Sequence, residues 1–130
     1  MKQNKAVRRA LYTKAVYQWE REFLDLHPRM NAALPMPALQ RLARRIWRSH
    51  GNGKTMPKIV AGQGLASDAR RQSYYTIRVD NTEPRIILAR HQRRVGVLLH
   101  ELAHALGDYR EYDHGPAFTN RYFHLLGQYA

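Results

Sequence analysis

The stretch VGVLLHELAHALG, residues 95–107, decides how the C-terminal half of this chain folds. Its apolar residues recur three and four positions apart, which predicts a helix that buries one face. His100 and His104 are four residues apart, about 400° around a helix, so they lie one turn apart on nearly the same side. We expect this helix to span about residues 92–106, to end at Gly107, and to present both histidines away from its apolar face.

The segment HELAH within this stretch is the HExxH pattern of zinc hydrolases. Two imidazoles one helical turn apart can bind the same metal ion, and Glu101 is placed beside the first of them, within reach of a metal-bound water. One more protein ligand would leave an open coordination position, which catalytic zinc sites need and structural sites usually lack. We therefore expect one Zn²⁺ per chain, with His100 and His104 as ligands and Glu101 as the catalytic acid/base.

A third ligand must come from outside this helix. His114 follows His104 by ten residues, beyond the predicted helix end, and a loop could return it to the metal. The metzincin spacing HExxHxxGxxH is excluded, because its third histidine would stand where the chain has Arg110. We therefore prefer His114. The same loop also contains possible oxygen ligands or orienting carboxylates, which are Asp108, Glu111 and Asp113.

Three further helices are expected around the HExxH helix, over residues 4–26, about 37–50 and about 116–128. The first carries apolar side chains at spacings of 4, 3, 4 and 3, which are Tyr12, Val16, Trp19, Phe23 and Leu26. The second has its own apolar face, made of Leu39, Leu42, Ala43, Ile46 and Trp47. In the last helix, Phe118 and Tyr122 should pack inward.

In the middle of the chain, the pattern of apolar and polar residues is that of β-strands. Residues 58–60 predict a short strand, and residues 74–79 and 85–89 predict a hairpin across a turn of polar residues and proline. Together with the helices, they predict an α+β fold with a small, mostly antiparallel sheet. We see no repeat or linker, so residues 1–130 are expected to form a single domain.

The charge balance favours a polyanionic partner. The chain has 22 Lys and Arg against 10 Asp and Glu, a formal net charge of +12. Such an excess attracts nucleic acid through phosphate contacts and counterion release. Candidate nucleic-acid-binding residues are the clustered arginines Arg41, Arg44, Arg45, Arg48, Arg70 and Arg71.

Two absences narrow the class of protein. The sequence has no cysteine, so disulfides, cysteine zinc ribbons and thiol nucleophiles are excluded. No apolar stretch is long enough to span a membrane, and no signal-peptide core follows the basic residues 1–10. We therefore expect an intracellular, cytoplasmic protein that has no membrane partner. The oligomeric state is left open.

HELAHAL at residues 100–106, followed by HGPAF at 114–118, resembles the SprT-like metallopeptidase family, whose signature is HExxH and then His-Gly-x-x-Phe. The resemblance implies a zincin-like fold, zinc held by His100, His104 and His114, and Glu101 as the catalytic acid/base. Many members carry a C-terminal cysteine zinc ribbon, so this chain would be a minimal catalytic domain. Some members cleave proteins that are bound or crosslinked to DNA.

The sequence thus predicts a zinc-dependent metalloprotease that cleaves protein or peptide substrates, with DNA-associated proteins as one candidate class. Tyr109 and Tyr112 are candidate donors to the transition state, and Tyr122 is a weaker one because it should pack in the core. Two alternatives stay open. The first is a YbeY-like zinc endoribonuclease, which also uses three histidines and would suit a basic chain. The second is a non-catalytic nucleic-acid-binding protein with a structural zinc.

Overall fold

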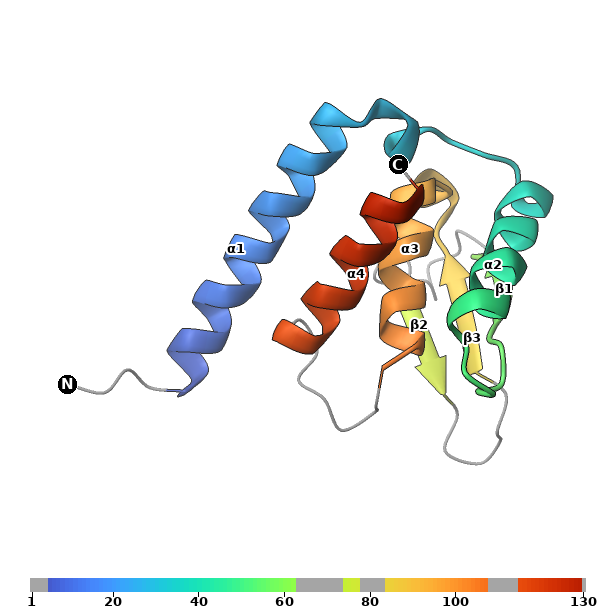
Figure 1. Ribbon diagram of the computed structural model, residues 1–130. Coiled ribbons are helices and arrows are strands. Elements are labelled where there is room, and N and C mark those ends of the chain that lie inside the picture. The colour runs from blue at the N-terminus through green and yellow to red at the C-terminus, as the bar shows by residue number, and fades with distance from the viewer. Residues whose placement is uncertain (1–4, 63–73, 78–83, 108–114, 130) are drawn as a thin grey trace.

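The computed structural model describes residues 5–62, 74–77, 84–107 and 115–129 of the chain. Four α-helices, three strands and two short 3₁₀ helices make up this part (Figure 1). In chain order they are α1 (Lys5–Leu26), η1 (Pro28–Asn31), α2 (Met36–His50), β1 (Lys58–Ala61), β2 (Tyr74–Ile77), β3 (Pro84–Leu88), η2 (Arg90–Gln92), α3 (Val95–Ala105) and α4 (Pro116–Tyr129). The predicted α+β composition is confirmed, with each expected helix and strand present within a few residues of its predicted bounds.

The three strands form one sheet in the order β1-β3-β2. β2 runs antiparallel to β3, as the predicted hairpin requires, with Tyr75 opposite Ile86. β1 runs parallel to β3, with Ile59 opposite Ile86. The prediction of a mostly antiparallel sheet is therefore wrong. The physical reason is the connection: the chain leaves β1, crosses to the far edge to form β2, and returns through the centre as β3 in the direction of β1.

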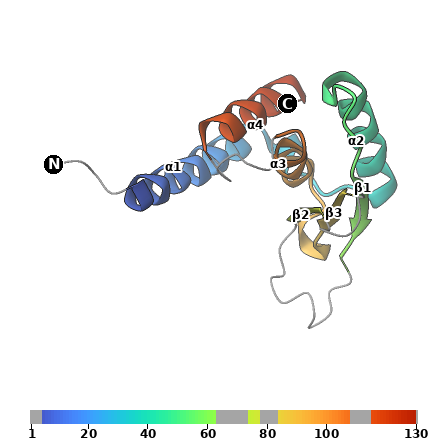
Figure 2. The same cartoon turned by 90° about the horizontal axis from the view of Figure 1, so that it is seen from below.

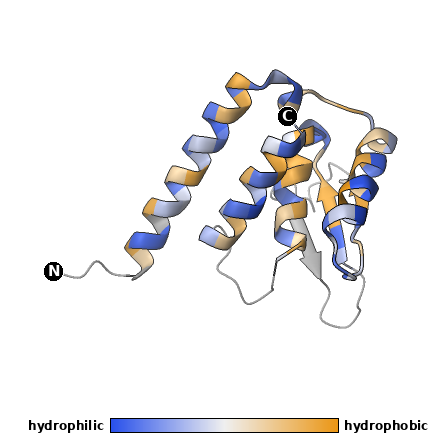
Figure 3. Cartoon of the chain, in the orientation of Figure 1, coloured by the Kyte–Doolittle hydropathy of each residue, from blue (hydrophilic) through white to orange (hydrophobic). Residues whose placement is uncertain are grey.

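Helix α3 lies at the centre of the molecule, between the sheet and α4. It contacts β2 and β3 on one side and α4 on another, and α2 packs against both α3 and β1 (Figures 1 and 2). Because it is covered on several sides, α3 is more apolar than the other helices, as Figure 3 shows. Its fully buried leucines join side chains of the sheet, α2 and α4 in one core, whose members include Leu39, Ile46, Ile86, Leu88, Leu98, Leu99, Leu102, Phe118, Tyr122 and Leu126.

Helix α1 packs less closely than its sequence pattern predicts. Val16 is buried and Phe23 is partly buried, but Trp19 is 45% exposed and Leu26 is 77% exposed. The N-terminal half of the helix projects away from the other elements in both views (Figures 1 and 2). The predicted stripe is thus only partly confirmed: regular spacing indicates a helix, but it does not show how much of the stripe other elements will cover.

Gly51, which follows α2, is closely surrounded by Trp47 of that helix. A Cβ at Gly51 would lie 2.7 Å from the Trp47 carbonyl oxygen, so a side chain does not fit there. The turn that follows carries Lys54. Its Nζ donates hydrogen bonds to the carbonyl oxygens of Leu106 and Gly107, at 3.2 and 2.7 Å. A cation at the C-terminus of a helix satisfies its last carbonyls and opposes its dipole, so this contact stabilises the end of α3.

In the described part of the chain, no helix combines the length and the apolar character that crossing a bilayer requires.

Candidate metal centre

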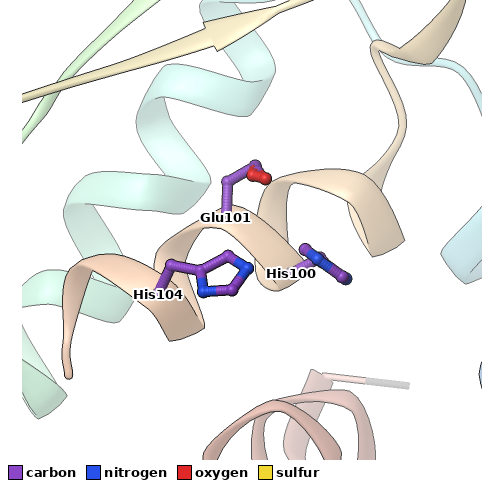
Figure 4. Close-up of side chains that lie close together, drawn as sticks. All are labelled: His100, Glu101 and His104. Carbon is purple, nitrogen blue, oxygen red and sulfur yellow. The ribbon is translucent and has the colours of Figure 1, made fainter. Parts of the chain in front are cut away.

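Three side chains of α3 converge on a site that could hold a metal ion. His100, Glu101 and His104 each bring one ligand atom into a group whose members lie within 4.8 Å of one another. Figure 4 shows all three leaving adjoining positions of the helix. The helical phasing predicted from the sequence is confirmed, because a helix places residues four apart one turn above each other.

The site is partly enclosed. Glu101 is only 6% exposed, although it is a carboxylate, and the His100 side chain is 15% exposed. His104 is also half-buried. The expectation that both histidines are displayed on a face away from the apolar one is wrong in one respect: α4 and α1 cover the face that they occupy.

Aromatic rings of α4 form the wall beside the two histidines. The Phe118 ring stacks on His104, with centroids 4.2 Å apart and an angle of 19° between the planes. It also meets His100 edge-on at 5.0 Å, and Tyr122 meets His100 at the same distance. These contacts orient both imidazoles. Stacking covers a ring face, whereas an imidazole nitrogen binds a metal in the plane of the ring.

A carboxylate from α1 reaches the same site. The Oε2 of Glu20 lies 3.0 Å from Nδ1 of His100, and the Tyr122 hydroxyl is also hydrogen-bonded to Glu20. Burial, and then the nearby charge and hydrogen bond of Glu20, raise the pKa of Tyr122 far above its ordinary value. Tyr122 therefore remains a neutral hydroxyl that donates to Glu20. Helices α1, α3 and α4 meet at this network.

Comparison of the chain with known protein families, with curated proteins and with solved structures found no match. The function must therefore be inferred from the residues and the geometry of the chain itself.

The donor set suits zinc. Zinc binds imidazole nitrogen and carboxylate oxygen, commonly in a four-coordinate site. Two half-buried imidazoles on one helix, packed against an aromatic ring, provide two such donors within 4.8 Å of each other. The third expected ligand, His114, lies outside the described residues, as do Asp108, Glu111 and Asp113.

Several other predicted site residues also fall outside the described part of the chain. They are the candidate transition-state donors Tyr109 and Tyr112 and the arginines Arg70 and Arg71. The four arginines of α2 are described, and all of them, Arg41, Arg44, Arg45 and Arg48, are exposed. The structure does not bring these arginines to the histidines, because α1 and α4 cover the histidine side of α3 while α2 lies elsewhere on the core (Figure 2).

Glu20 was not predicted as a site residue. Its sequence position holds a usable signal: it lies four residues after Val16 and three before Phe23, in line with the inward face of α1. A carboxylate on a helix face that packs inward calls for a partner. The sequence does not indicate which one, because His100 is 80 residues away.

Proposed function

We propose that this chain is a zinc-dependent metallopeptidase. One observation carries the proposal: His100, Glu101 and His104 lie on one helix with their ligand atoms within 4.8 Å of one another. This is the arrangement that the HExxH pattern requires, with two imidazoles for the metal and a carboxylate beside them. Half-buried histidines and a buried glutamate distinguish it from a solvated helix surface.

The chemistry follows from the placement of Glu101. When bound, zinc acidifies a water molecule and polarises the scissile carbonyl. Glu101 accepts the proton of the attacking water and returns it to the leaving amine, so one carboxylate serves as base and then as acid. Because Glu101 is only 6% exposed, bulk water competes little for that proton.

His114 is our proposed third ligand, and the length of the chain supports it. Phe118 contacts both imidazoles, and His114 precedes Phe118 by four residues. Four residues span at most about 14 Å, so the connection is short enough for a ligand role of His114. The resemblance to the SprT-like signature supports the same assignment, with Gly115 following His114 and α4 beginning at Pro116.

A zincin-like arrangement would also supply a place for the substrate. In the described part of the chain, β2 has β3 on one side and no strand on the other, and it contacts α3. An extended peptide could add to this edge by backbone hydrogen bonds, close to the helix that carries the metal ligands. We propose β2 as the strand that holds the substrate.

The exposed arginines favour a nucleic acid as a second partner. Arg41, Arg44, Arg45 and Arg48 lie within about two turns of α2, and the chain carries a net charge of +12. We propose that they bind DNA and so place the enzyme on DNA-associated proteins. The same surface would also serve an RNA substrate, which is the prediction of the rival endoribonuclease.

Glu101→Gln tests the function. Zinc content is measured by elemental analysis, and cleavage of casein and of histones is followed with and without DNA, with an RNA substrate in parallel. We expect about one zinc per chain in both forms, and a loss of peptide cleavage of at least about 100-fold in the variant. Glu22→Gln, on the exposed side of α1, is the matched control and should cleave normally.

The outcomes separate the candidate functions. Undiminished proteolysis by Glu101→Gln would refute the role of Glu101. RNA cleavage without peptide cleavage would favour the endoribonuclease. Zinc bound without hydrolysis of either substrate would favour a nucleic-acid-binding protein with a structural metal.

A further inference from the structure

Glu20 of α1 is joined to the proposed metal ligand His100, although the two residues are 80 positions apart. We propose that Glu20 is a positioning residue of the metal centre, which holds His100 in the tautomer and orientation that present Nε2 to the metal. This inference rests on the proposed function. It adds a residue that the HExxH pattern does not contain, contributed by a different helix.

The tautomer follows from the chemistry of the pair. An ionised carboxylate can only accept hydrogen bonds, so at 3.0 Å the proton between Glu20 and His100 belongs to Nδ1 of the imidazole. A neutral imidazole carries one N–H, so Nε2 is then the unprotonated nitrogen, which is the one that can act as a metal ligand. A carboxylate on the outer nitrogen also makes the imidazole a more basic ligand and fixes its ring plane.

Glu20 is itself held in place from α4. The buried Tyr122 hydroxyl donates to the same carboxylate, and Tyr122 packs against the His100 ring at 5.0 Å. Glu20 therefore accepts hydrogen bonds from the His100 imidazole and the Tyr122 hydroxyl, both of which are nearly enclosed. Its own side chain is 21% exposed. Its neighbour Glu22 differs: that residue is exposed and accepts a hydrogen bond from Gln18 within the same helix.

Substitution of Glu20 tests the inference through zinc affinity rather than through catalysis alone. The full chain is titrated with Zn²⁺ against a chromophoric chelator, and unfolding of each metal-free form is recorded. We expect the Kd for zinc to rise about 10- to 100-fold in Glu20→Gln and Glu20→Ala, the usual effect of removing such a partner. Glu22→Gln should keep the wild-type Kd, and Glu20→Asp should recover part of the loss.

A second measurement needs no variant. Ring-nitrogen NMR of the metal-free wild-type protein at about pH 8, where an ordinary histidine is neutral, reports which nitrogen of His100 carries the proton. The inference requires Nδ1–H, and a population with Nε2–H would overturn it. A folded Glu20→Gln with an unchanged zinc Kd would overturn it as well. Failure of the wild-type protein to bind zinc would instead refute the proposed function, and the inference with it.

Discussion

The imidazole of His104 lies flat against the ring of Phe118, with the ring centroids 4.2 Å apart and the planes 19° apart. The same phenyl ring meets His100 edge-on at 5.0 Å. One buried side chain of α4 therefore touches both histidines of α3, and α4 contributes to the candidate metal centre through packing. This relationship leads to the first prediction.

Phe118→Leu should weaken the metal site as well as the fold. A leucine keeps an apolar contact but cannot stack on His104, and it leaves part of the phenyl volume empty. We expect a loss of about 1–2 kcal/mol in the free energy of unfolding, together with weaker zinc binding. Urea unfolding and zinc titration measure the two effects.

Phe123→Leu is the matched control, because Phe123 packs on Tyr122 and on the aromatic rings of α1. It should lower stability while changing zinc affinity less. Equal zinc affinities for the two variants would show that the stacking on His104 does not position the ligand.

Tyr122 should make stability fall at alkaline pH. Burial raises its pKa in the folded chain, whereas an unfolded tyrosine titrates near pH 10. Below about pH 10 both states keep the proton, and the contribution of Tyr122 is fully present. Above about pH 10 the unfolded chain loses this proton while the folded chain retains it, so stability should fall by up to about 1.4 kcal/mol per pH unit.

Tyr122→Phe removes this titrating group, so its stability should fall less steeply than that of the wild type between about pH 9.5 and pH 11. Urea unfolding at each pH gives the two slopes. The control is Tyr17→Phe, at an exposed position of α1, which should keep the wild-type slope. Identical slopes for Tyr122→Phe and the wild type would contradict the prediction.

The third metal ligand can be identified by paired substitutions. If His114 is a ligand, His114→Gln should reduce the zinc content to below about a tenth of an ion per chain after dialysis, and His104→Gln should do the same. The reason is that a site with three protein ligands loses most of its zinc affinity when one of them is removed. Asp113→Asn should retain the metal with lower affinity if Asp113 orients an imidazole. His124→Gln, at an exposed position of α4, is the control. Full zinc content in His114→Gln would exclude His114.

The arginines of α2 should determine binding to nucleic acid. Arg44→Ser combined with Arg45→Ser removes two exposed charges, and we expect the slope of log K against log salt for duplex DNA to fall by up to about two. Arg21→Ser combined with Arg29→Ser removes the same net charge from α1 and η1 and is the control. If both pairs weaken binding equally, net charge rather than the α2 surface governs the interaction.

The elements of this fold could be predicted because their signals are local. Apolar spacing along residues 95–107 defines α3, and Pro116 followed by Phe118 and Tyr122 defines α4. The direction of β1 could not be predicted, because parallel or antiparallel pairing depends on the path of the chain between strands. How much of α1 the other elements cover could not be predicted from the sequence either. Trp19 and Leu26 continue the regular apolar spacing of the helix but remain largely exposed.

For the site, the sequence by itself determined that His100, Glu101 and His104 share one helix, because the 3.6-residue period is a local property of the backbone. Only the tertiary structure placed Phe118 against both imidazoles and Glu20 on Nδ1 of His100. Those contacts join three different helices, two of them, α1 and α3, distant in the chain, and they form because the helices pack on one core. The placement of the candidate ligands on one helix is therefore a property of the local sequence, and the orientation of their side chains is a property of the packing.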